Sequence, residues 1–144
     1  MNPKIIFLPV CAQALLTFLV LLFLFYQRVS TMRKNEMSPQ ELEDKTRLDQ
    51  LPKSAVNSSD NFENLFEMPV LFFVAMGIIY SIGTVDALYF NLAMVYVTLR
   101  AIHSFIHCIS NHVFSRFLTF LLSSVVLVMI WIRIATQLWN TLSA

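Results

Sequence analysis

The chain has 144 residues, of which 57% are hydrophobic and only 13% are charged, and its formal net charge is +1. Soluble domains carry about 25% charged residues, so this composition excludes an ordinary soluble domain. A net charge so close to zero gives no indication of nucleic-acid binding, and the distribution of charge along the chain is more informative.

Four predominantly apolar segments follow one another, and each is long enough to cross a bilayer. A membrane-spanning helix needs about 20 such residues, and the segments lie at about 5–26, 62–82, 87–109 and 113–139. The first is longer than the apolar run of a signal peptide and has no small-residue cleavage site after it, so we expect it to be retained. The pattern predicts an all-α integral membrane four-helix bundle, a single domain over residues 1–144.

The connection between the first two segments, residues 27–61, carries most of the positive charge. Six of the ten Lys and Arg residues lie there: Arg28, Arg33, Lys34, Lys45, Arg47 and Lys53. Such residues are enriched in cytoplasmic loops, so the connection is predicted to be cytoplasmic and both termini to face the other side. Within it, Ser38-Pro39-Gln40-Glu41 matches a capping box and predicts a short surface helix near 39–51.

Three ionisable side chains lie inside the third apolar segment. Arg100, His103 and His107 are spaced i, i+3 and i+7, so on a helix they share one stripe. A charge in hydrocarbon costs about 3 kcal/mol or more, and Arg100 therefore needs polar partners. The predicted topology brings four more polar residues to the same depth: Glu63, Asn64, Glu67 and Arg116.

This polar layer has two interpretations. In the first it is an internal salt-bridge network, in which Glu63 or Glu67 neutralises Arg100 and holds the helices in register. In the second it is a pocket for a polar or anionic ligand, which better explains the surplus of donors. Arg133 lies near the opposite interface, close to Trp131 and Trp139, and is predicted to be an interfacial anchor.

Two strings of this layer resemble the MAPEG family, the membrane-associated proteins of eicosanoid and glutathione metabolism. They are N-F-E-N-L-F-E-M-P-V-L-F-F from Asn61 to Phe73, and R-A-I-H-S-F-I-H-x-x-x-N from Arg100, with Arg116 beyond it. The order of four spans with a long first connection also matches. The resemblance implies a four-helix subunit that assembles as a homotrimer and holds glutathione between subunits near the cytoplasmic face.

The resemblance also implies roles for individual residues. Asn64 and Glu67 match an Asn-x-x-Glu that binds the glutathione peptide, and Arg100 and His103 match an Arg-x-x-His on the third helix. Arg116 matches the Arg that stabilises the glutathione thiolate. The chemistry is consistent with this role, because a cation beside a thiol lowers its pKa and raises the thiolate fraction.

The chain departs from the family pattern at three positions. His107 stands where a Tyr is common, Phe117 stands where one member has a Ser, and Asp60 stands where glutathione-using members have an Arg. Replacing a carboxylate-binding Arg by an acid predicts weaker binding of anionic glutathione. Arg28 or Arg33, near the end of the first helix, would have to compensate.

The function predicted on this basis is that of a glutathione-dependent transferase or peroxidase acting on a lipophilic electrophile from the bilayer. Arg116 would stabilise the thiolate and His107 would donate a hydrogen bond. One alternative is a non-catalytic binding or scaffold protein of the same fold. Another is a metal-binding membrane protein that uses His103, His107, Glu63 and Glu67. Short loops and the resemblance favour a bacterial inner membrane.

Overall fold

The computed structural model describes residues 2–35, 53–110 and 112–143. The short helix predicted near 39–51 and its capping box lie outside these residues. Within the described ranges every regular element is helical: a 3₁₀ turn η1 (Pro3–Ile6) and the helices α1 (Phe7–Asn35), α2 (Lys53–Ser81), α3 (Ala87–Ile109) and α4 (Val113–Leu142).

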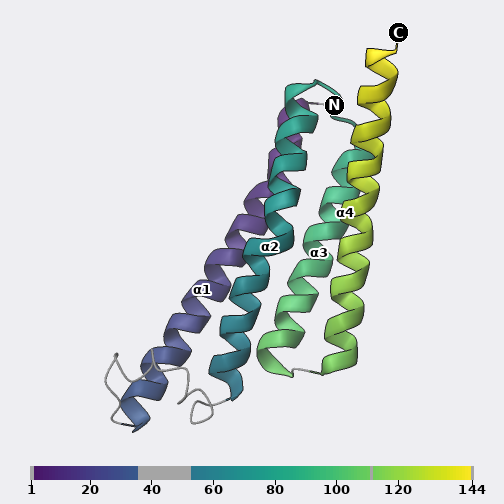
Figure 1. Cartoon of the computed structure of the whole chain (residues 1–144). Helices are drawn as coiled ribbons and strands as arrows, with labels where there is room; N and C mark the ends of the chain where they lie inside the picture. Colours follow the sequence, from purple (N-terminus) through teal and green to yellow (C-terminus); the bar gives the residue numbers. More distant parts are fainter. Residues whose placement is uncertain (1, 36–52, 111, 144) are drawn as a thin grey trace.

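The four helices run up and down along one bundle axis (Figure 1). The two chain termini and the α2–α3 turn lie at one end, here called the termini end. The α3–α4 turn, the end of α1 and the start of α2 lie at the other, here called the α3–α4 end. Each of the four helices is long and apolar enough to cross a membrane. The predicted all-α, four-helix membrane fold is therefore confirmed.

The helices are longer than the apolar segments from which they were predicted. α1 continues to Asn35 and α2 already begins at Lys53, well outside the apolar windows 5–26 and 62–82. Hydropathy detects the part of a helix that suits hydrocarbon, whereas backbone hydrogen bonding continues through polar residues. Both helices therefore extend past the apolar layer at the α3–α4 end.

The turn between α2 and α3 is set by Gly83. Its φ of 69° is the left-handed conformation that glycine adopts readily. The Thr84 N–H donates to the Ile79 carbonyl and the Gly83 N–H to the Tyr80 carbonyl, each at 3.2 Å, which is the Schellman pattern at a helix end. Asp86 then caps α3 by accepting a 2.9 Å hydrogen bond from the Tyr89 N–H.

The apolar core occupies the interior of the bundle and is formed by η1, α2, α3 and α4, with Val10 and Ala12 of α1 packed against it. Phe72 of α2 stacks on Tyr96 of α3 with ring centroids 4.6 Å apart, and both side chains are fully buried. Further buried members come from η1, α2, α3 and α4: Ile6, Ala75, Met76, Ile79, Ala93, Leu127, Ile130 and Ile134. The outward faces are apolar too, as expected for helices in lipid.

A charged cluster joins α3 to α4 at the termini end. Both Arg133 terminal nitrogens donate to the Asp86 carboxylate, and the Arg133 guanidinium carbon lies 4.1 Å from the Tyr89 ring centroid. Hydrogen bonds from Arg133 are the main reason that the pKa of Asp86 is lowered to about 2. The structure therefore gives Arg133 an ion-pair partner, 47 residues away along the chain, that was not predicted. Its role as an interfacial anchor stays a prediction.

Candidate functional site

Arg100 is a completely buried cation in the second half of α3, the half that leads to the α3–α4 turn. Its Nη2 donates a 2.7 Å hydrogen bond to the Asn64 main-chain carbonyl of α2. Its Nε and Nη1 have no hydrogen-bond partner among the described residues. The guanidinium also lies over the Phe120 ring of α4, 5.7 Å from its centroid. Because unpaired buried donors are costly, this arrangement leaves Arg100 able to bind further acceptors.

Arg116 contacts both imidazoles of the α3 stripe. Its Nη1 lies 2.9 Å from His107 Nε2, and its main-chain oxygen lies 3.1 Å from His103 Nδ1. The local sequence explains the contact: α3 ends at Ile109 and α4 begins at Val113, so Arg116 is in the first turn after a short connection. The α3 stripe and the start of α4 therefore face each other.

These contacts determine which nitrogen of each imidazole carries the proton. A guanidinium only donates, so His107 Nε2 must accept and the neutral ring carries its hydrogen on Nδ1. A carbonyl only accepts, so His103 must carry a hydrogen on Nδ1, which leaves Nε2 as the acceptor in its neutral form. Both His103 Nε2 and His107 Nδ1 are buried without a partner among the described residues. The two rings thus offer one acceptor and one donor.

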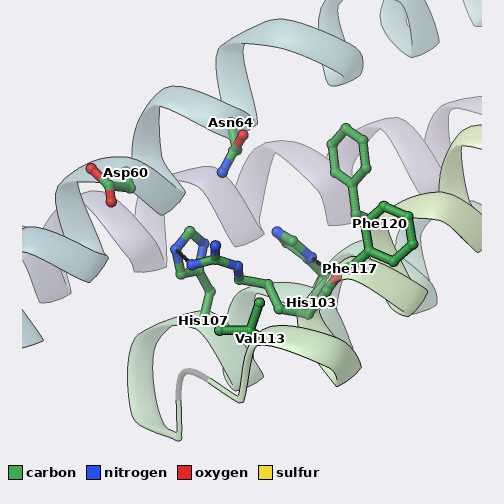
Figure 2. A pocket seen from close by; sticks show the side chains of 8 residues that line it. Asp60, Asn64, His103, His107, Val113, Phe117 and Phe120 are labelled. Carbon is green, nitrogen blue, oxygen red and sulfur yellow. Dashed lines mark hydrogen bonds between the residues drawn. The ribbon is translucent and has the colours of Figure 1, made fainter.

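A pocket of about 350 Å³ opens where α2, α3 and α4 meet (Figure 2). Asp60 and Asn64 of α2 face His103 and His107 of α3 across it. The eight lining residues are Asp60, Asn64, His103, His107, Val113, Arg116, Phe117 and Phe120. The pocket therefore has polar walls on α2 and α3 and a third wall on α4 that is apolar apart from Arg116.

The structure brings five of the six predicted site residues together. Asn64, His103, His107 and Arg116 line the pocket, and Arg100 lies beside it, bonded to the Asn64 carbonyl. Glu67 does not line the pocket, and its side chain is exposed. Its predicted role in binding stays a prediction.

The alternative salt-bridge interpretation has partial support in the described residues: Glu67 acts on the Arg100 charge through space, but no direct ion pair joins them there. Glu63 and Glu67 are both exposed, and the hydrogen bond made by Arg100 goes to a neutral carbonyl. Arg28 and Arg33 of α1 are exposed and do not line the pocket. Nor do three or more His, Cys, Asp or Glu side chains gather as a metal site within the described ranges. The predicted metal-binding alternative therefore lacks a ligand set there.

Sequence reasoning missed the apolar wall of the pocket and the position of Asp60 in it. Counted from Val113, the residues Arg116, Phe117 and Phe120 stand at i+3, i+4 and i+7 and so share one face of α4. That periodicity can be read from the sequence. Asp60 precedes Asn64 by four residues, one helical turn, so it projects from the same face of α2. It was considered only as a departure from a family pattern.

A second polar contact fastens α2 to α3 beside the pocket. Asn61 is fully buried, accepts a 3.3 Å hydrogen bond from the Ser104 hydroxyl and donates to the Cys108 sulfur at 3.4 Å. Ser104 and Cys108 follow His103 and His107 by one residue each, so they lie on the adjacent face of α3. This contact fixes the rotation of α3 relative to α2, and with it the direction of the two imidazoles.

The sequence model of the MAPEG family matches residues 6–136, which is nearly the whole chain. No curated protein and no solved structure matches.

Proposed function

The chain belongs to the MAPEG family, and from this premise we propose that it is a glutathione-dependent transferase or peroxidase acting on a lipophilic electrophile. The family includes such enzymes and also non-catalytic members, so membership alone does not decide the activity. The observation that carries the proposal is the position of Arg116, whose guanidinium lines a pocket of about 350 Å³ and is oriented by His107.

Arg116 supports thiol chemistry through its fixed positive charge. A guanidinium stays protonated throughout the physiological range, and beside a bound thiol it favours the thiolate, the nucleophilic form. In the proposed reaction the S–H proton leaves to solvent and the sulfur electron pair forms a bond to the electrophilic atom. The leaving group departs with the electron pair of the bond that breaks. Arg116 acts by charge alone and exchanges no proton.

The proposed peptide site uses the remaining donors around the pocket. Arg100 has two buried N–H groups without partners, and His103 has an unpaired acceptor, so both suit the carboxylates and amides of a peptide. Asn64 lines the same pocket as His103. Glu67 is exposed on α2, so its proposed contact with glutathione needs a neighbouring subunit, in keeping with the homotrimer that we also propose.

The apolar wall supports entry of the second substrate from the membrane. Val113 and Phe117 line the pocket while 67% and 59% of their surfaces are exposed. Their side chains therefore belong both to the pocket and to the lipid-facing surface of α4. We propose that the electrophile reaches the thiolate along this face, at the cytoplasmic side of what would be a bacterial inner membrane.

Calorimetric titration of glutathione into the detergent-purified protein tests the proposal. We expect a dissociation constant in the micromolar to millimolar range, weakened at least tenfold in Arg116→Ala and unchanged in Lys4→Ala, an exposed cation in the turn before α1 that does not line the pocket. Absence of binding at millimolar glutathione would exclude the transferase. Binding without turnover of any lipophilic electrophile would instead favour the non-catalytic alternative, which Asp60 and Phe117 in the pocket wall already suggest.

A further inference from the structure

The pocket contains an acidic group that the proposed thiol chemistry does not use. Asp60 lines the α2 wall with an exposed side chain, and it has no hydrogen-bond or ion-pair partner in the part of the chain that the structure describes. Arg116 lines the α4 wall of the same pocket. The pocket therefore presents a carboxylate on α2 and a guanidinium on α4.

The other groups facing the pocket do not supply a positive charge for Asp60. His107 accepts from Arg116 through Nε2, so this ring is neutral in the observed arrangement. Asn64 is an amide, and the remaining wall is formed by Val113 and aromatic side chains. Arg100 is fully buried and bonded to a main-chain carbonyl. Among the described residues, Arg116 is the one cation that lines the pocket with Asp60, and its Nη1 lies against His107. A ligand that brings its own cation would therefore pair with Asp60.

We propose that Asp60 binds the ammonium group of the thiol co-substrate, so that the pocket selects thiols that carry a free amino group. The inference rests on the proposed function, because it assigns the sulfur to Arg116. A zwitterionic thiol would match both walls, with its cation on α2 and its thiolate on α4, and complementary charges of this kind confer specificity. Glutathione meets the requirement through its γ-glutamyl ammonium, whereas thiols acylated on that nitrogen do not.

The competing explanation is that Asp60 is a solvated side chain with no part in recognition. A thermodynamic cycle across protein and ligand separates the two. The probes are glutathione and N-acetylglutathione, which has the same thiol but no ammonium. The variants are wild type, Asp60→Asn, and Glu63→Gln as the matched control, an exposed acid on the same helix that does not line the pocket.

Wild type and Glu63→Gln are expected to bind glutathione about tenfold more tightly than N-acetylglutathione. In Asp60→Asn the two dissociation constants should differ by less than about threefold. Asp60→Asn should also bind N-acetylglutathione more tightly than wild type does, because it no longer repels the ligand carboxylates. A gain in affinity cannot result from misfolding, so this measurement guards against a merely damaged variant.

An unchanged preference in Asp60→Asn would overturn the inference and leave the transferase proposal intact. If wild type binds neither peptide, the proposed function fails, and cysteamine and 2-mercaptoethanol then test Asp60 by themselves. Binding of cysteamine that requires Asp60 and exceeds that of 2-mercaptoethanol would support ammonium recognition. No binding of cysteamine, or equal binding in Asp60→Asn, would overturn it.

Discussion

The ion pair at the termini end gives a prediction that does not depend on the function. Asp86 accepts from the Tyr89 N–H as the cap of α3 and pairs with Arg133 of α4. Asp86→Asn keeps an oxygen for the cap but removes the charge, whereas Asp86→Ala removes both. The two variants therefore separate the ion pair from the helix cap.

The size of the ion-pair contribution follows from the pKa of Asp86. Lowering it from 3.8 to about 2 would correspond to about 2.4 kcal/mol if the shift acted in full. The Asp86 side chain is 42% exposed, so solvent screening reduces this to about 1 kcal/mol. Loss of an N-cap adds about 1 kcal/mol. We expect Asp86→Asn to cost about 1 kcal/mol and Asp86→Ala about 2 kcal/mol.

The direction of the pH dependence is also fixed. The folded-state pKa lies below the unfolded value, so the contribution is complete above pH 3.8 and is lost as the pH falls through about 2. Unfolding by sodium dodecyl sulfate in detergent micelles, followed by circular dichroism between pH 7 and pH 2, measures the difference between wild type and Asp86→Asn. Other carboxylates titrate equally in both proteins and cancel. Equal stability of the two at pH 7, or a difference that does not shrink toward pH 2, would refute the reasoning.

Three further substitutions test the site, the turn and the core. His107→Phe removes the acceptor of Arg116 and should lower kcat/KM with glutathione by about 10- to 100-fold, since hydrogen bonds to charged groups contribute about 1.5–3 kcal/mol. His107→Gln keeps an acceptor and should recover part of the lost activity. An equal loss in both variants would argue against a role of His107 in positioning Arg116. Gly83→Ala should cost about 1–2 kcal/mol of stability because of the φ of 69° at this position. Gly77→Ala, inside α2 with open space around it, should stabilise the protein by about 0.5–1 kcal/mol. Thermal melting in detergent compares the two variants, and a loss of stability in both would contradict the conformational argument. Phe72→Ala should cost about 3–5 kcal/mol by opening a cavity against Tyr96, and a loss below about 1 kcal/mol in the same assay would mean that the site collapses around the gap.

The fold could be predicted from the sequence because membrane helices satisfy their backbone hydrogen bonds internally. Four long apolar segments therefore suffice to predict four helices. The helix ends were harder to predict: α1 runs to Asn35 and α2 starts at Lys53, in polar sequence where hydropathy gives no signal. Their positions depend on helix propagation beyond the apolar layer rather than on transfer to lipid.

The candidate site was partly predictable, and the reason differs from residue to residue. Arg100, His103 and His107 share a stripe by periodicity alone, and depth places Arg116 beside them. The exposed position of Glu67 was not predictable, because depth does not determine rotation about the helix axis. The Asp86–Arg133 pair was missed for a related reason: both residues are near one interface, but only the packing of α3 on α4 brings them into contact.

The short connection between α3 and α4 has a consequence for biogenesis. His107 and Arg116 are nine residues apart, and His103 and Arg116 thirteen, so their contacts lie within a single helical hairpin. If this hairpin enters the membrane as one unit, Arg116 is bonded to an imidazole before the other two helices dock, which reduces the cost of transferring a charge into lipid. Arg100 lies over the Phe120 ring within the hairpin but donates its hydrogen bond to α2. Insertion of the hairpin and docking of α2 are therefore separable steps of maturation, and the pocket is completed only in the second.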